Sequence, residues 1–478
     1  MSAQAKIVSE QTADTRPAGA AHPERRLSSW LLMAFAAPCI PIAALGLPIS
    51  LYIPQFYAGP MGLGLGAVGT IFMLARLWDM VTDPLMGFVS DHYPTRWGRR
   101  RPWLVISTPL ICISTWFVFL PQAPVTTGYL LFWIFVLYLG WTMLTIPHLS
   151  WGAELSGDYY QRSRVHGFRE AGEIIGVPLV LAIPAVIEQF STGDFQTIRV
   201  ASMGLFIIVL LPIAVAINVW SVKERPARPQ PKLSFKDALG SLAENRPLRT
   251  LVIADAISGS AGSALGALFV YVATHVWGLG SSASLLMLIY FIAGLGFVPL
   301  VVRASRRFGK HRTLVGCCAF YVVAPPLTLL IPQGNMLAAA GLMVLLGVNV
   351  GGAGVLFRSI MADVADLDEL STGRQRTGVL YSFMALTRKG SGALAVGATF
   401  WALQWMGFDP AGDNSAAARN LALLFATVPM VCNLAVMALM WRFPIGAEQQ
   451  LELRQRLERA RSRGEHRKCA ESPQLPVD

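Results

Sequence analysis

The stretch ARLWDMVTDPLMGFVSD, residues 75–91, places three charged side chains inside a segment long and apolar enough to cross a membrane. This apolar segment extends over 64–90, and about 20 such residues span a bilayer as a helix. Arg76, Asp79 and Asp83 are three and four residues apart, so a helix presents them on one face. Charges at membrane depth cost about 2.5–3.5 kcal/mol each and persist where they face a cavity or one another. The segment is therefore predicted to be a transmembrane helix with a functional face.

Eleven further apolar segments of membrane length occur along the chain. They lie at 29–57, 103–120, 128–154, 167–190, 196–221, 248–276, 281–303, 311–332, 335–362, 377–406 and 417–443. The 478 residues are 54% hydrophobic and 14% charged, whereas a globular chain has about 25% charged residues. Twelve spans with short loops use most of this length. We therefore expect an all-α membrane protein of about twelve transmembrane helices.

Two loops of the first half have counterparts in the second half. The motif WGRRR at 97–101 corresponds to FGKHR at 308–312, and Arg162 corresponds to Arg374, at offsets of 211 and 212. A shared offset indicates duplication of a six-helix unit, an arrangement common among transporters. The predicted divisions are a tail at 1–28, a six-helix half at 29–221, a central loop at 222–247, a second half at 248–443 and a tail at 444–478.

Basic residues are concentrated in every second loop. They lie within 96–101, 162–169, 223–249, 303–312 and 374–376. The loops at 121–128 and 332–335 have almost none. Lys and Arg accumulate on the cytoplasmic side of membrane proteins, so we expect the basic loops and both termini to be cytoplasmic. The net charge of +11 therefore reflects membrane orientation, and nucleic-acid binding is not expected because no soluble face collects these charges.

The sequence shows no pattern typical of an enzyme or of a cofactor site. The six cysteines lack paired spacing, and five lie in apolar segments as small core residues. There is no Walker-type phosphate loop and no nucleophile–base constellation. We expect no enzymatic activity and no cofactor other than Na⁺ as a coupling ion. The expected partners are a small-molecule substrate and membrane lipid, with the protein working as a monomer.

The charged face of the segment at 64–90 suggests a cation site. Two carboxylates and one guanidinium sum to −1, and one bound cation would neutralise this charge. Thr82 could add an oxygen ligand of the kind that hard cations such as Na⁺ prefer, and a proton would serve the same electrostatic purpose. The alternative is a purely structural ion-pair network. We expect Asp79 and Asp83 to bind the coupling cation and Arg76 to balance their charge.

Three other charged residues in apolar segments are candidates for contact with the solute. Arg169 either contacts the solute or forms a structural pair with Glu173, four residues later. Asp255 has no basic neighbour on its own segment, which marks it as a functional candidate. Lys389 either faces the cavity or extends to the cytoplasmic interface.

Three motifs resemble those of a known transporter family. RLWDMVTDPLMGFVSDHYPTRWGRRRPWL at 76–104 resembles the signature of the glycoside–pentoside–hexuronide:cation symporter family of the major facilitator superfamily. The resemblance continues through WGAELSGDYYQRSRVHGFRE at 151–170 and ADVADLDELSTGRQRTGVLYSFMALTRKGSGA at 362–393. It implies a major facilitator fold of two six-helix halves and solute uptake coupled to Na⁺, Li⁺ or H⁺. It also implies that Asp79 and Asp83 are cation ligands supported by Thr82 and Thr142.

The resemblance is weaker for the residues that would bind sugar. It implies that Arg169 contacts the solute, and it matches Lys389 to the family's lysine in the eleventh helix. However, Thr145 stands where melibiose permease, a member of the family, has an aspartate, and Leu149 stands where it has a sugar-binding tryptophan. The segment at 29–57 has no carboxylate to accept hydrogen bonds from sugar hydroxyls.

The sequence thus predicts a cation-coupled symporter in a cell membrane. Its substrate would be a small organic solute such as a glycoside or sugar, moved by alternating access between the two halves. One alternative is a proton-coupled exporter or lysolipid carrier, which would have an apolar lateral opening. An alternative of another class is a non-transporting membrane assembly or receptor protein on the same fold, which would need no titratable, cavity-facing pair at Asp79 and Asp83.

Overall fold

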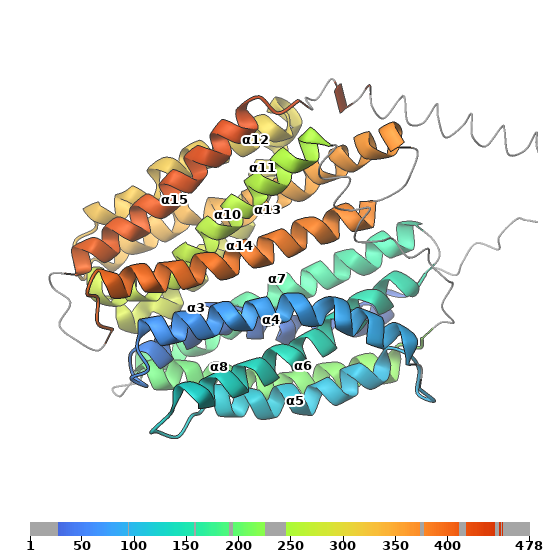
Figure 1. Cartoon of the computed structure of the whole chain (residues 1–478), viewed down its shortest axis with the longest axis horizontal. Coiled ribbons are helices and arrows are strands. Elements are labelled where there is room, and N and C mark those ends of the chain that lie inside the picture. The colour runs from blue at the N-terminus through green and yellow to red at the C-terminus, as the bar shows by residue number, and fades with distance from the viewer. Residues whose placement is uncertain are drawn as a thin grey trace, which may run out of the picture.

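The protein folds into long helices arranged in two groups (Figure 1). The computed structural model describes residues 27–93, 95–156, 159–190, 195–224, 245–372, 377–410, 417–444, 449–450 and 452. Most of the predicted tails and most of the central loop lie outside these ranges.

The first group contains the helices up to residue 221. They are α2 (Ser29–Ala36), α3 (Cys39–Ala58), α4 (Leu65–His92), α5 (Arg101–Phe119), α6 (Thr127–Glu154), α7 (Tyr159–Phe190) and α8 (Phe195–Ser221). The second group begins at residue 246. It comprises α10 (Arg246–Tyr271), η1 (Val272–Val276), η2 (Gly280–Ser282), α11 (Ala283–Phe308), α12 (Lys310–Val323), η3 (Pro325–Leu330), α13 (Met336–Thr372), α14 (Thr377–Trp405) and α15 (Ala418–Trp441).

These helices agree with the segments predicted from hydropathy. Within the described residues, eleven helical segments are long and apolar enough to cross a membrane, and α2 and α3 together form the first of them. A further helix, α14, has 29 residues and contains adjacent charged residues, Arg388 and Lys389. With α14 the described chain has the twelve long helices that the sequence predicts.

The loop between α4 and α5 is held by a single carboxylate. Glu224 accepts hydrogen bonds from the backbone N–H groups of residues 99–101, at 2.6, 2.9 and 2.6 Å. These N–H groups lie at the start of α5, where the helix dipole favours a negative charge. Gly98 has φ of 122°, and a Cβ there would lie 2.6 Å from the Glu224 carboxylate, so only glycine fits this position.

The corresponding loop of the second group makes a similar contact. Arg100 pairs with Glu154 at the end of α6 at 2.7 Å, and Lys310 pairs with Asp363 near the end of α13 at 2.6 Å. Gly309 also has a positive φ, of 86°. The two loop motifs that are repeated in the sequence thus each connect to the fourth long helix of their own group. We call this end of the protein, where the basic loops lie, the basic end.

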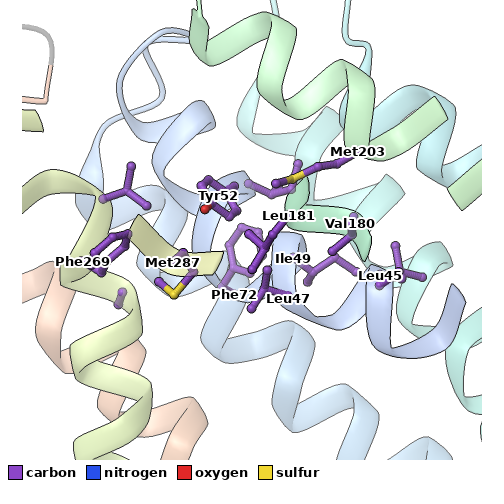
Figure 2. Close-up of a cluster of buried hydrophobic side chains, with 14 of the residues drawn as sticks. Leu45, Leu47, Ile49, Tyr52, Phe72, Val180, Leu181, Met203, Phe269 and Met287 are labelled. Carbon is purple, nitrogen blue, oxygen red and sulfur yellow. The ribbon is translucent and has the colours of Figure 1, made fainter. Parts of the chain in front are cut away.

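The two helix groups share a hydrophobic core only away from the basic end. Figure 2 shows Tyr52 and Phe72 of the first group in one buried cluster with Phe269 and Met287 of the second group. A second buried cluster consists entirely of residues from the second group, including the part of α10 near Leu248 at the basic end. The groups are therefore packed together at the opposite end and have separate cores near the basic end.

Close backbone approach joins α4 and α14 at the opposite end. A Cβ on Gly69 would lie 2.7 Å from Cβ of Phe400, so the helices could not approach this closely with a larger residue there. Trp401 donates a hydrogen bond from Nε1 to Oγ1 of Thr70 at 3.2 Å. These contacts bring the middle of α4 against the middle of α14, which is where the charged residues of both helices lie.

A buried ion pair also joins the two groups at the opposite end. Arg199 on α8 pairs with Glu188 on α7, and the side chain of each is 1% exposed. Arg199 also donates to the Gly280 carbonyl at 2.6 Å, and Ser284 donates to Glu188 at 2.9 Å. Gly280 and Ser284 belong to the second group, so the ion pair closes this end through hydrogen bonds across the groups.

Removing one member of the ion pair should destabilise the protein more than removing the charge of both. Arg199→Met leaves the Glu188 charge buried, at a cost of about 3–5 kcal/mol. In the double variant Glu188→Gln/Arg199→Met no lone charge remains, so we expect a higher melting temperature than in Arg199→Met. Thermal unfolding of the purified proteins measures this. A double variant no more stable than Arg199→Met would contradict the electrostatic interpretation.

Candidate functional site

A cluster of charged side chains joins α4 to α14 across the two groups. Lys389 Nζ lies 2.9 Å from Oδ2 of Asp79 and 2.5 Å from Oδ2 of Asp83. Both carboxylates project from one face of α4 because they are four residues apart. Asp79 and Asp83 are called the carboxylate pair below. The lysine ammonium therefore takes the position that a bound cation would have between two carboxylates.

Two threonines complete this cluster. Thr142 on α6, which is fully buried, lies with its hydroxyl 2.9 Å from Asp79 Oδ1 and 3.2 Å from Asp83 Oδ1. A hydroxyl has one proton to donate, so the two carboxylates share this donor. Thr82 lies 3.3 Å from Thr142 and donates to the backbone carbonyl of Trp78 at 3.1 Å. The structure thus brings together four of the residues predicted for cation binding.

The structure changes the role predicted for Arg76. Its Nη2 donates to the Ser50 hydroxyl at 2.8 Å, and no ion pair joins it to the carboxylate pair among the described contacts. Lys389, predicted as a solute contact, balances the carboxylates directly. Arg76 still lines a small cavity of about 150 Å³ together with Asp79 and Lys389. Its charge therefore acts on the pair through space.

The structure also gives Asp255 a counter-ion. Asp255 Oδ1 lies 2.6 Å from Nη1 of Arg388 on α14, and the Asp255 side chain is 1% exposed. Asp255 has no basic neighbour on its own helix, as the sequence indicates, but its partner lies 133 residues away. A carboxylate buried against one arginine holds that arginine in place, so Asp255 positions Arg388 and is not itself placed to touch a solute.

Arg169 lies outside the charged cluster. Its Nη2 lies 3.7 Å from Oε1 of Glu173 on the same helix. This is the structural pair that the sequence offers as the alternative to solute contact. Both residues nevertheless line a cavity of about 1150 Å³, which extends from Asp83 and Lys389 toward the basic end. Arg169 therefore remains exposed to a solute that fills this cavity.

Sequence reasoning missed Arg388 and Ser50. Arg388 is 46% exposed and lines a cavity of about 470 Å³ beside Arg76 and Lys389. The sequence feature that could have identified Arg388 is the pair of adjacent basic residues, Arg388 and Lys389, within an apolar segment. Ser50 lines all three cavities, but a lone serine in an apolar helix gives no sequence signal.

The fold and the site together define a class of protein. Two groups of membrane-length helices are packed at one end and enclose a charged cluster near mid-helix, as in a multi-pass transporter of the major facilitator fold. The family model described as MFS/sugar transport protein matches residues 34–447. The chain therefore belongs to the MFS/sugar transport protein family.

Individual relatives agree with this classification. The isoprimeverose transporter of Lactiplantibacillus pentosus is 26% identical over 403 residues, covering 80% of this chain and 82% of that protein. The human sodium-dependent lysophosphatidylcholine symporter 1 is 24% identical over 461 residues, covering 87% and 82%. The crystal structure of the nucleoside transporter NupG has a TM-score of 0.62 at 14% identity, covering 87% and 100%, which shows the shared fold. The predicted fold and family are confirmed, and the protein belongs to a family of transporters.

Removing the lysine should make the protein dependent on an external cation. In Lys389→Met the carboxylate pair loses the ammonium that contacts both members, so Na⁺ or protons should bind it more readily. We expect Na⁺ to raise the melting temperature of Lys389→Met more than that of wild type or Lys389→Arg. Thermal unfolding in NaCl and in choline chloride measures the difference. Equal Na⁺ effects in all three proteins would show that the pair does not bind this ion.

Proposed function

We propose that the protein couples solute transport to Na⁺ or H⁺ through the carboxylate pair. The observation that carries this proposal is the Lys389 ammonium between Asp79 and Asp83, at 2.9 and 2.5 Å. Two carboxylates around one positive charge form a site for which a second, diffusible cation competes. The threonine hydroxyls supply further oxygen ligands for Na⁺.

Competition for the carboxylate pair provides a coupling mechanism. When Na⁺ or H⁺ binds Asp79 and Asp83, Lys389 is released from its contacts with α4. Lys389 belongs to α14 in the second helix group, so this exchange breaks an ionic contact between the groups. Binding of the cation thereby changes both the link between the groups and the charges that face the solute.

The orientation follows from the distribution of charge. The basic loops lie at one end, and Lys and Arg favour the cytoplasmic side, so this end and both termini are cytoplasmic. The cavity of about 1150 Å³ extends toward this end while the opposite end is packed, so the structure corresponds to an inward-facing carrier. The protein resides in a cell membrane and works as a monomer surrounded by lipid.

A second candidate function is transport of a lysolipid. The cavity of about 1150 Å³ is lined mainly by apolar side chains, and one relative is named a lysophosphatidylcholine symporter. A receptor or assembly protein on the same fold fits less well, because a charged cluster linking the two groups at membrane depth is costly to keep without a function. Symport remains the function that the charged cluster supports best.

Asparagine substitutions of the carboxylate pair test the coupling. Asp79→Asn or Asp83→Asn removes one of the two negative charges that attract the cation. Either variant should lose accumulation against a gradient, with the internal solute concentration falling to about the external one, and should lose cation dependence with it. Exchange of labelled solute down its gradient should persist. The measurement is solute uptake into vesicles under imposed Na⁺ and proton gradients, normalised to folded protein.

Asp409→Asn serves as the matched control for this experiment. Asp409 is an exposed aspartate that lies outside the three cavities. It should keep both accumulation and ion dependence. Normal accumulation with normal ion dependence in Asp79→Asn and Asp83→Asn would rule out the carboxylate pair as the coupling site.

The proposed orientation can be tested by labelling single introduced cysteines. Trp97 is exposed in a basic loop, and Gln333 is exposed in a loop at the opposite end. A membrane-impermeant maleimide added to intact cells should label Gln333→Cys but not Trp97→Cys, and inside-out vesicles should give the reverse pattern. Wild-type protein, whose described cysteines are buried or half-buried, is the control. Labelling of Trp97→Cys in intact cells would reverse the orientation.

A further inference from the structure

The cavities around Lys389 differ sharply in chemistry. The cavity of about 1150 Å³ is called the apolar cavity here. Most of its lining is apolar, including Ile42, Leu47, Ile146, Leu149 and Leu386, and its charged members are Asp83, Arg169, Glu173 and Lys389. The hydroxyl of Thr145, also in this lining, already donates to the Trp141 carbonyl at 2.9 Å. A sugar needs many acceptors and donors around its ring, because a buried hydroxyl without a partner is costly. This lining suits an apolar body better than a sugar.

The cavity of about 470 Å³ is cationic and is called the anion pocket here. Arg76, Arg388 and Lys389 line it, and none of its other described lining residues is acidic. Three glycines and Ser263 of α10 form part of the rest. A Cβ on Gly259 would lie 3.0 Å from Cγ of Arg388, so glycine gives the arginine stem room beside α10.

The guanidinium groups in the anion pocket have donors to spare. Arg388 donates from Nη1 to Asp255, and Arg76 donates from Nη2 to Ser50. Each guanidinium has five N–H groups in a planar fork that matches a carboxylate, sulfate or phosphate. Two such groups facing one pocket can hold an acidic group through charge-assisted hydrogen bonds.

Charge balance connects the anion pocket to the carboxylate pair. The Arg388–Asp255 ion pair is neutral. The positive charges of Arg76 and Lys389 offset the two negative charges of the carboxylate pair. The cluster therefore sums to zero. An anion alone would leave −1 at membrane depth and a cation alone +1, and either charge is costly there. One cation and one monoanion bound together restore neutrality, which explains why neither should bind well without the other.

We propose that the solute is an amphipathic organic monoanion whose acidic group binds Arg76 and Arg388 while its apolar body fills the apolar cavity. This inference rests on the proposed cation coupling at Asp79 and Asp83 and specifies the substrate class of the same carrier. The cation that displaces Lys389 from the carboxylate pair also frees its ammonium for the acidic group. The two sites are therefore coupled by one shared side chain.

Matched pairs of probes test this substrate class. Naphthoate and octanoate are monoanions with an apolar body, and their primary amides have nearly the same shape without the charge. Binding is measured as thermal stabilisation of the full-length protein in nanodiscs, with NaCl at pH 5.5 and 7.5 and with choline chloride at pH 7.5. At least one acid should stabilise the protein, and more strongly when Na⁺ or protons are abundant. The amides and the neutral sugar methyl galactoside should have little effect.

Substitution of Arg388 locates the acidic group. Arg388→Gln should weaken binding of the acid about tenfold or more, because it removes a charge-assisted pair of donors. If the lone Asp255 carboxylate prevents folding, the neutral variant Asp255→Asn/Arg388→Gln takes its place with the same expected loss. Arg303→Gln, an exposed arginine on α11 outside the cavities, should leave binding unchanged.

The outcomes separate this inference from the coupling proposal. Equal stabilisation by acids and amides, or by methyl galactoside alone, would overturn the anionic class even if Na⁺ still binds the carboxylate pair. Unchanged acid binding in both Arg388 variants would overturn the location. Acid binding that is lost with Arg388 but indifferent to Na⁺ and pH would keep the substrate class and overturn the coupling at Asp79 and Asp83.

Discussion

The contact between Lys389 and the carboxylate pair is the constraint on which the rest of the site depends. It joins α4 to α14, and so the first helix group to the second, with two largely buried carboxylates at membrane depth and an ammonium that is 39% exposed to the cavities. Removing a partner from such a contact leaves a charge that costs several kcal/mol. The carrier can therefore exchange Lys389 for another cation but cannot simply lose it. This requirement links binding of a cation to the contact between the two helix groups.

The distribution of packing along the helices supports movement around this contact. The opposite end is held by a shared hydrophobic core, by Gly69 against Phe400, and by the buried Glu188–Arg199 pair with its hydrogen bonds across the groups. Among the described residues the basic end has no comparable shared core, and the network around Glu154 lies within the first group. One exposed ion pair, between Arg358 on α13 and Glu170 on α7 at 2.9 Å, also crosses the groups. Each group can therefore keep its internal structure while the angle between them changes, as alternating access requires.

Features set by spacing within a short segment are predicted from the sequence, whereas contacts between distant segments are not. Helix positions, the repeated loop motifs and the shared face of Asp79 and Asp83 all follow from spacing within short segments. The partner of Lys389 lies about 300 residues away, and that of Asp255 lies 133 residues away. No spacing rule connects such residues, because helix packing alone decides which faces meet. For that reason the sequence identifies most of the charged residues but not their pairing. The direct contact of Lys389 with the carboxylate pair and the contact of Arg388 with Asp255 are not predicted.

Part of the cavity that faces the solute lies on helices other than the two that form the ionic contact. The carboxylate pair and the basic residues that face it belong mainly to α4 and α14, which also line part of the apolar cavity, whereas the rest of that cavity is formed by α3, α6 and α7. Thr145 and Leu149, which depart from the melibiose permease pattern, lie in that second set. Substitutions there change the shape and polarity offered to the solute without touching the ion contacts. A common cation mechanism can thus serve relatives named for solutes as different as isoprimeverose and lysophosphatidylcholine.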